Sequence, residues 1–299
     1  MTKTLSKCCR PSRSHQPICY DITMKTKSGK SLHPIGIGTW GISSESSGKD
    51  NKYKGVVAVK GNEQSEIESL RYSLGKGQNH IDCAELYGAF YTDEVVGRVL
   101  EGFKRDDLFI ADKLWKTSVA RDHVRPTVEK MLSKLGTDYL DMLYIHAPWD
   151  DAPWVEAIPQ IDQLIDEGVV RHFAVSNFTL KDMKTAQEIA AHPVAANQMN
   201  YNVLHQSEVN EPFKDFCAQH DIKIVPYQPI KRGEVFENEV ITEIARRHNV
   251  SASQIALAWL LQQDMLPIPK AVNKKHIDDN ILAVDVELTD EDLSQLAEL

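Results

Sequence analysis

The chain has 299 residues, of which 42% are hydrophobic and 26% charged, a composition typical of a globular protein with a substantial core. Its 34 Lys and Arg against 43 Asp and Glu give a formal net charge of −9, which argues against a general affinity for nucleic acid. No apolar run approaches the roughly 18 residues that a membrane span requires. The five cysteines are odd in number and scattered, which excludes a disulfide scaffold and favours a reducing, cytoplasmic compartment.

The first 20 residues differ from the rest because they contain basic residues and no acid. No apolar stretch follows them, so they are not a secretory signal. Pro11 and Pro17 interrupt any amphipathic helix of a targeting peptide, and we expect residues 1–20 to be a mobile, solvated tail. Four potential zinc ligands in the tail match no standard zinc spacing, so no metal is expected: Cys8, Cys9, His15 and Cys19.

From residue 21 onward, strand-like and helical segments alternate. A hairpin is predicted first, with residues 22–27 and 30–33 on either side of Ser28-Gly29. Eight strands are predicted at 35–38, 80–83, 108–111, 139–145, 171–175, 194–198, 222–225 and 266–269. Helical periodicity is found near 63–76, 92–103, 118–135, 154–167, 180–191, 207–219, 237–263, 275–282 and 289–298. This alternation predicts an α/β fold, a single (β/α)8 TIM barrel over residues 21–299 whose bottom is closed by the hairpin.

Residues 36–41 match the glycine spacing G-x-G-x-x-G of dinucleotide-binding proteins. That motif acts on a turn between a strand and a helix, where the helix N-terminus holds the pyrophosphate. Here the glycines lie within or at the end of the first predicted strand, and helical periodicity begins only near Glu63. We therefore reject a Rossmann site.

Polar residues gather where the predicted strands end, which in a TIM barrel is the face that carries the chemistry. The second, third and fourth strands end near Asp82 and Tyr87, Lys113, and His146 respectively. The next three end near Ser176 and Asn177, Gln198, and Tyr227.

The first four of these residues suit the protonation of an oxygen on which negative charge develops. A free tyrosine has a pKa of about 10, and a neighbouring ammonium lowers that pKa. The carboxylate of Asp82 would keep Lys113 charged, and His146 would hold a carbonyl oxygen. Carbonyl reduction also needs a hydride donor, which no side chain provides, so a nicotinamide cofactor is implied.

At these residues the chain resembles the aldo-keto reductase family, a family of NAD(P)H-dependent carbonyl reductases with the TIM barrel fold. The segments that carry the resemblance are 36–40, 81–88, 112–115, 145–148, 175–178 and 268–270. The resemblance implies that Tyr87 is the general acid, Lys113 the modulator of its pKa and Asp82 the partner of that lysine. It further implies that His146 orients the carbonyl and that the nicotinamide is held by Ser176, Asn177, Gln198 and the stacking ring of Tyr227.

The same resemblance implies a site for the phosphates and the adenosine of the cofactor. It is expected at Gln228, Ile230, Lys231 and Gly233 after the seventh strand, and at Lys270, Asn273, His276, Asp279 and Asn280 after the eighth. Gln228 and His276 depart from the family pattern, since many members have Ser and Arg there. We expect NADP(H) to be preferred because basic residues surround Lys270, with NAD(H) as the alternative.

Trp40 and Trp115 match family positions, and Trp149 follows His146. We expect these three residues in the substrate pocket. Trp154 is expected either on the rim of that pocket or packed on a helix. We expect a monomeric, cytoplasmic enzyme that reduces small-molecule aldehydes or ketones and binds neither nucleic acid nor membrane. Two other readings stay open: a cofactor-binding regulatory subunit of the same fold with little turnover, and a lyase or isomerase that uses Lys113 as a Schiff base.

Overall fold

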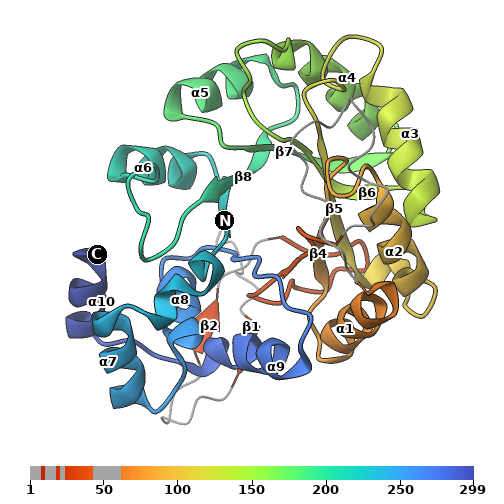
Figure 1. Cartoon of the computed structure of the whole chain (residues 1–299). Helices are drawn as coiled ribbons and strands as arrows, with labels where there is room; N and C mark the ends of the chain where they lie inside the picture. Colours follow the sequence, from red (N-terminus) through yellow and green to blue (C-terminus); the bar gives the residue numbers. More distant parts are fainter. Residues whose placement is uncertain (1–7, 11–17, 21–23, 43–61) are drawn as a thin grey trace.

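Seven parallel strands form a sheet that follows the chain order, as a computed structural model of residues 8–10, 18–20, 24–42 and 62–299 shows (Figure 1). The strands are β3 (Ile37–Gly38), β4 (His80–Asp82), β5 (Phe109–Leu114), β6 (Leu140–Ile145), β7 (Val170–Ser176), β8 (Val194–Asn200) and β9 (Lys223–Tyr227). Each strand pairs in parallel with the next, so that their carboxyl ends meet at one face.

Residues 266–269 close the ring, although they form no regular strand. The Ile268 N–H donates to the Pro226 carbonyl of β9, and the Pro269 carbonyl accepts from the Gly38 N–H of β3, both at 3.1 Å. Proline lacks an N–H, and two prolines in this segment leave its ladder incomplete. The predicted eighth strand is therefore present as a paired segment, and the predicted barrel is confirmed.

The close approach of this segment explains why the first strand carries glycine. A Cβ atom on Gly38 would lie 2.5 Å from the carbonyl oxygen of Ile268. Any side chain at that position would push the closing segment off the barrel. Gly36 and Gly38 thus allow the closing segment to approach the first strand.

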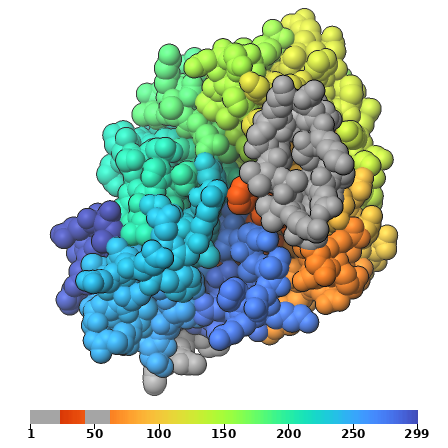
Figure 2. Space-filling view, viewed as in Figure 1, coloured from red at the N-terminus to blue at the C-terminus, as the bar shows by residue number. Residues whose placement is uncertain are grey.

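In the described part of the chain, ten α-helices lie around the barrel (Figure 1). They are α1 (Glu63–Gly75), α2 (Tyr91–Leu100), α3 (Val124–Leu135), α4 (Trp154–Asp166), α5 (Leu180–Ile189), α6 (Glu211–Gln219), α7 (Glu239–His248), α8 (Ala252–Leu261), α9 (Lys274–Leu282) and α10 (Asp290–Ala297). The space-filling view shows α9, in blue, meeting the orange region of α1 (Figure 2). Tyr72 of α1 donates to Asp278 of α9 at 2.8 Å, so the last part of the ring contacts the first.

The helical pattern predicted over 237–263 is divided into two helices, because the chain breaks between α7 and α8. Asn249 adopts the left-handed conformation, with φ 54° and ψ 44°, and ends α7. Ser251 then starts α8 through a capping box with Gln254. The apolar periodicity continues across this break. Asn249 and Ser251, however, are residue types that commonly end and begin helices.

Side chains on alternate strand positions face opposite sides of the barrel wall. Phe109 and Ala111 of β5 belong to the apolar cluster inside the barrel, together with Tyr144 of β6. Lys113, two residues beyond Ala111, therefore points into the barrel interior. Asp112 faces the layer between strands and helices.

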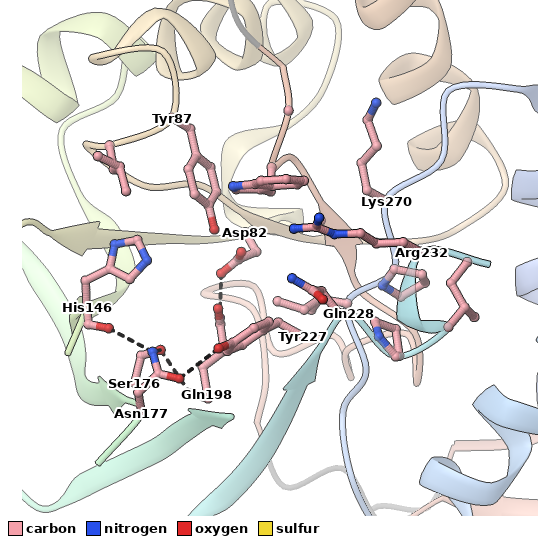
Figure 3. Close-up of a pocket in the computed structure, with 18 residues that line it drawn as sticks. Asp82, Tyr87, His146, Ser176, Asn177, Gln198, Tyr227, Gln228, Arg232 and Lys270 are labelled. Atoms are coloured by element: carbon pink, nitrogen blue, oxygen red, sulfur yellow. Dashed lines mark hydrogen bonds between the residues drawn. The ribbon is translucent and has the colours of Figure 1, made fainter. Parts of the chain in front are cut away.

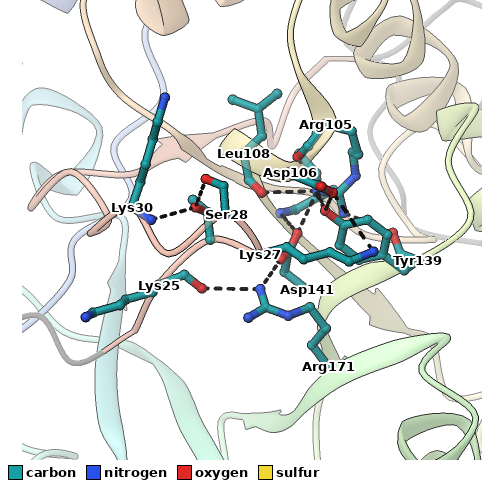
Figure 4. A network of polar contacts seen from close by, with 12 residues as sticks. Lys25, Lys27, Ser28, Lys30, Arg105, Asp106, Leu108, Tyr139, Asp141 and Arg171 are labelled. Atoms are coloured by element: carbon teal, nitrogen blue, oxygen red, sulfur yellow. Dashed lines mark hydrogen bonds and ion pairs between the residues drawn. The ribbon is translucent and has the colours of Figure 1, made fainter.

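The predicted hairpin is described from residue 24 onward, residues 22–23 lying outside the described part, and its one antiparallel bridge lies at the bottom of the barrel (Figure 4). Lys25 pairs with Ser31 around a turn at Gly29, whose φ is 87°. The Lys25 carbonyl accepts from Arg171 at 3.2 Å. The fully buried carboxylate of Asp141 accepts in turn from Arg171, at 2.5 Å, and from Arg105, at 2.8 Å.

Within the range predicted as a tail, the structure describes two short strands, β1 (Cys8–Arg10) and β2 (Ile18–Tyr20), which pair antiparallel. His15 and the side chains of Cys8, Cys9 and Cys19 lie outside what the structure describes. Among the described residues there is no group of three or more His, Cys, Asp or Glu side chains placed to hold a metal ion. No described helix is both long and apolar enough to cross a membrane.

Candidate active site

A cavity of about 440 Å³ opens at the carboxyl end of the barrel, where the strand ends meet (Figure 3). It brings together residues that are spread over more than 200 positions of the chain. The predicted site residues that line it are Trp40, Asp82, Tyr87, His146, Ser176, Asn177, Gln198, Tyr227, Gln228, Ile230 and Lys270.

Lys113 lies just beneath this lining and connects two of its residues. Its side chain is fully buried, and its Nζ donates to Asp82 Oδ2 at 2.7 Å and to the Cys83 carbonyl at 2.7 Å. The third donor of the ammonium reaches the Tyr87 hydroxyl oxygen at 3.3 Å. The carboxylate, the ammonium and the phenol thus form one continuous buried chain.

Electrostatics in this chain act in the predicted directions, but burial is the larger effect on Tyr87. Burial raises the pKa of Tyr87 to about 12, although the Lys113 ammonium lowers it in part. Burial disfavours the charged form of Lys113, yet Asp82 and Tyr87 more than offset that cost, so the pKa of Lys113 is raised. The lysine is therefore charged and the tyrosine protonated throughout the physiological range.

His146 follows β6 and faces Tyr87 across the cavity, with the ring centroids 6.1 Å apart. Burial, together with the Lys113 charge, holds the pKa of His146 well below its usual range. The imidazole is therefore neutral, and its protonated ring nitrogen can donate a hydrogen bond to an oxygen in the cavity.

The predicted aromatic residues divide into three groups. Trp40 lines the cavity and is 48% exposed at its mouth. Trp115 packs edge-on against His146 at 5.4 Å, and Trp149 packs on Trp115 at 5.0 Å, so these two support the histidine from the side. Trp154 packs on Phe178 at 4.7 Å, away from the cavity lining.

On the opposite side of the cavity, amide side chains are linked by hydrogen bonds. Asn177, held at φ 59°, donates from Nδ2 to the His146 carbonyl at 3.2 Å and accepts at Oδ1 from the Tyr227 hydroxyl at 3.0 Å. Ser176 Oγ donates to the Gln198 carbonyl at 2.9 Å. Gln198 Nε2 donates to Asp82 Oδ1 at 2.8 Å, which connects the amide side to the lysine and tyrosine.

Of the two basic residues in the loop after β9, Lys231 and Arg232, the structure places Arg232 in the cavity lining. Lys231 turns away to the Leu204 carbonyl and to Glu234, and Gly233 lies outside the cavity lining. Arg232 lines the cavity instead, with its guanidinium 5.0 Å from the Trp40 ring centroid. The cause is the left-handed backbone of this turn, which reverses the side-chain direction expected from sequence order.

Apart from Lys270, which lines the cavity, the predicted residues of the last segment lie outside its lining, at the N-cap of α9 or within that helix. Asn273 caps that helix by accepting the Lys275 N–H at 2.9 Å, and His276 is exposed on its first turn. Asp279 accepts from Ser251 and Ser253 of the α8 start at 2.7 and 2.6 Å, and Asn280 is buried.

A second acidic group, which the sequence reading missed, lies behind the site on the helix side. Asp93 of α2 and Asp112 of β5 are both fully buried. Neither carboxylate oxygen of Asp93, nor Asp112 Oδ2, has a hydrogen-bond partner among the described residues, whereas Asp112 Oδ1 accepts the Lys113 N–H at 2.7 Å. Burial raises the pKa of both groups, to about 8 for Asp112, and each acid is surrounded by further carboxyls.

The residues around the cavity fit a nicotinamide nucleotide. Tyr227 offers an aromatic ring, and Asn177 and Gln198 offer amide groups of the kind that pair with a carboxamide. Arg232 and Lys270 bring two cations to the same cavity, and neither forms an ion pair with a described residue. The cavity thus offers an aromatic group for the nicotinamide ring, amide groups for its carboxamide and cations for the phosphates.

Comparisons with known proteins identify one family of reductases. A profile of the Aldo/keto reductase family matches residues 34–299. The glyoxal reductase of Bacillus subtilis is 31% identical over 245 residues, covering 81% of this chain and 86% of that protein. The methylglyoxal reductase YeaE of Escherichia coli is 29% identical over 274 residues, covering 89% and 90%.

Solved structures of other proteins also superimpose on most of this chain. A thermostable aldo-keto reductase in complex with the inhibitor epalrestat superimposes with a TM-score of 0.82 at 29% identity, covering 92% of this chain and 98% of that one. An aldo-keto reductase from Klebsiella pneumoniae in complex with NADPH gives 0.78 at 28% identity, covering 92% and 94%.

Proposed function

The chain belongs to the aldo-keto reductase family, and on that premise we propose that it reduces aldehydes or ketones to alcohols with NADPH, with Tyr87 as the proton donor. The observation that carries this proposal is the buried sequence of contacts from Asp82 through Lys113 to Tyr87, which opens onto a cavity beside a neutral His146. That arrangement suits the transfer of one proton from Tyr87 to a carbonyl oxygen in the cavity.

When bound, the nicotinamide nucleotide supplies the hydride. Asn177, Ser176 and Gln198 are proposed to hold its carboxamide, and Tyr227 to stack on its ring. Lys270 and Arg232 are proposed to bind its phosphates, since both are cations that line the cavity. NADP(H) is preferred over NAD(H) on this proposal because the additional phosphate meets positive charge.

The chain's own residues then orient the substrate oxygen and neutralise the negative charge that develops on it. The neutral His146 donates a hydrogen bond that orients the carbonyl. As negative charge develops on the oxygen, the Tyr87 hydroxyl transfers its proton to it. The Lys113 ammonium stabilises the phenolate that is left, and Asp82 keeps that ammonium in place.

The burial of Lys113 argues against its use as a Schiff base. A Schiff base needs an unprotonated amine that a carbonyl can reach. Lys113 is fully buried, its three donors are engaged, and its pKa is raised rather than lowered. These properties favour the reductase reading over a lyase or isomerase.

The proposed substrates are small carbonyl compounds, with 2-oxoaldehydes first among them. Relatives that cover most of this chain are named as reductases of glyoxal and methylglyoxal. The mouth of the cavity is open at the half-exposed Trp40, which suits a broad range of small aldehydes.

The test is a turnover screen of the purified full chain with glyoxal, methylglyoxal and aromatic aldehydes, each with NADPH and with NADH, following the loss of reduced cofactor. We expect turnover that is faster with NADPH. Tight NADPH binding without turnover on any carbonyl would instead favour a cofactor-binding regulatory subunit.

A further inference from the structure

Glu85 lies two residues before Tyr87 and connects the loop after β4 to the loop after β5. Its side chain is fully buried, and both of its carboxylate oxygens accept hydrogen bonds from that second loop. The backbone N–H of Trp115 donates to Oε2 at 2.8 Å, and the Ser118 hydroxyl donates to Oε1 at 2.8 Å. The Glu85 main chain is fixed as well, because its N–H donates to the Lys113 carbonyl of β5 at 3.1 Å.

These two contacts hold both ends of one short turn. Residues 115–118 form a turn that is closed by the Ser118 N–H, which donates to the Trp115 carbonyl at 2.8 Å. The Glu85 carboxylate binds the first residue of this turn through its main chain and the last through its side chain. A buried carboxylate that accepts from two groups limits the movement of both. The Trp115 main chain, and the indole that it carries, are thereby fixed relative to Glu85.

The Trp115 indole in turn packs on the imidazole of His146. The two rings meet edge to face with their centroids 5.4 Å apart, and the Tyr87 ring meets the same imidazole edge to face at 6.1 Å. His146 Nδ1 is buried and has no hydrogen-bond partner among the described residues. Within the described part of the chain, ring packing therefore sets the direction in which this imidazole faces the cavity.

We propose that Glu85 is a positioning residue for the histidine that orients the carbonyl, and that it acts through the Trp115 indole. Its carboxylate holds the turn, the turn holds the indole against the imidazole, and the imidazole then meets the substrate oxygen at one angle. The inference rests on the proposed function, because that function assigns the carbonyl oxygen to His146. Glu85 lies outside the described cavity lining and transfers no proton.

Glu85→Ala removes both contacts with the turn. We expect kcat/KM for methylglyoxal to fall about tenfold, because a carbonyl that meets a displaced imidazole is held less often in the reactive geometry. The Kd for NADPH should not change, because the amide side of the cavity is held by other contacts. Asn177 accepts from the Tyr227 hydroxyl, and Gln198 donates to Asp82.

Glu85→Gln is the conservative variant. Its amide oxygen can still accept from the Trp115 N–H, and its amide nitrogen can donate to the Ser118 hydroxyl oxygen. We expect Glu85→Gln to recover most of the kcat/KM that Glu85→Ala loses. Such a recovery would show that the two hydrogen bonds, rather than the negative charge, carry the effect.

Circular dichroism follows the Trp115 indole directly and without turnover. Trp115 and Trp149 pack edge to face with their centroids 5.0 Å apart, and two indoles at this distance give a coupled signal in the far ultraviolet. Trp149→Phe removes one indole of the pair and so identifies this signal in the parent. The signal should weaken in Glu85→Ala and return in Glu85→Gln.

Asp162→Ala is the matched control for the loss of a buried carboxylate. Asp162 of α4 is buried outside the cavity lining and accepts the main-chain N–H groups of Ala191 and His192 at 2.9 and 3.0 Å. Both alanine variants should lower the melting temperature, because each leaves donors unpaired. Only Glu85→Ala should also change kcat/KM and the indole signal.

The inference is overturned if Glu85→Ala retains either the kcat/KM or the indole signal of the parent, or if Glu85→Gln is as impaired as Glu85→Ala. A double-mutant cycle adds a further condition. If the loss caused by Glu85→Ala is undiminished in a Trp115→Ala background, the carboxylate acts by another route and the inference is wrong.

If Glu85→Ala does not fold, Ser118→Ala decides the matter, because it removes only one of the two contacts. A weaker indole signal and a lower kcat/KM in Ser118→Ala would support the inference, and parental values would overturn it. A parent without turnover would contradict the proposed function, whereas the indole signal would still test whether Glu85 holds Trp115.

Discussion

Lys113 Nζ approaches the Tyr87 hydroxyl oxygen at 3.3 Å, and an ammonium can only donate. The Tyr87 oxygen is therefore the acceptor in this contact, and its own proton points elsewhere. Tyr87 lines the cavity (Figure 3). The lysine contact therefore leaves the tyrosine proton available for an oxygen in the cavity.

Tyr87→Phe should abolish most of the carbonyl reduction while leaving the fold intact. The substitution removes the proposed proton donor, and positioned general acids contribute roughly 10²–10⁴-fold to rate. Steady-state kinetics with methylglyoxal and NADPH measure the loss. Tyr91→Phe, four residues later and bonded to Glu63 outside the cavity, is the control and should be silent. A Tyr87→Phe enzyme as active as this control would assign the proton to another group.

Lys113→Met should lower both activity and stability. The phenolate loses its stabilising charge, and Asp82 keeps only Gln198 as a partner in a buried position. Breaking a buried ion pair costs about 3–5 kcal/mol. Kinetics and thermal unfolding should fall together, whereas Lys116→Met, which breaks an exposed pair with Asp151, should change neither. Unchanged kcat/KM in Lys113→Met would remove the lysine from the mechanism.

Cofactor choice should depend on Lys270 and on residue 276. Lys270 lines the cavity, and His276 is exposed on the first turn of α9, close in sequence to Lys274 and Lys275. Lys270→Ala should weaken NADPH binding more than NADH binding. His276→Arg should tighten NADPH binding, because it adds a permanent charge and a planar donor. Dissociation constants for both nucleotides measure the two effects, and equal changes for NADPH and NADH would contradict a phosphate-binding role.

The Asp93–Asp112 pair should make the protein less stable as pH rises. The raised pKa of about 8 for Asp112 means that the folded protein holds a proton which the unfolded chain releases near the ordinary Asp pKa of about 4. The free energy of unfolding therefore decreases as pH increases across that interval. Urea unfolding at a series of pH values measures the slope.

Asp112→Asn should flatten this dependence, because an amide cannot ionise but still accepts the Lys113 N–H. Asp150→Asn, at an exposed position, should leave the slope as it is in the parent. An identical slope in parent and Asp112→Asn would show that the buried pair does not titrate in this range.

Much of the barrel was predictable because each strand is a short apolar run followed by a polar residue. Asp82, His146 and Gln198 each stand at such an end, and the parallel pairing of the strands brings them to one face. The apolar periodicity over 237–263 runs through Asn249 and does not itself show the break between α7 and α8. The left-handed backbone at Asn249 and the capping box at Ser251 mark that break.

Other parts of the site depend on backbone direction and on long-range packing, which the order of residues does not reveal. Lys231 and Arg232 are neighbours of equal charge, and only the left-handed turn decides which one enters the cavity. Asp93 and Asp112 come from separate elements, and each alone has the sequence environment of an exposed acid. Both are fully buried in the folded chain, and their burial has no local signal.

The Arg105–Asp141–Arg171 cluster gives the barrel an anchor at the end opposite its chemistry. It ties the starts of three strands to the first hairpin through charges that do not line the cavity. The loops at the other end are therefore not needed to hold the strands of the barrel together. The loops around the cavity can therefore differ in length and sequence while this anchor stays the same.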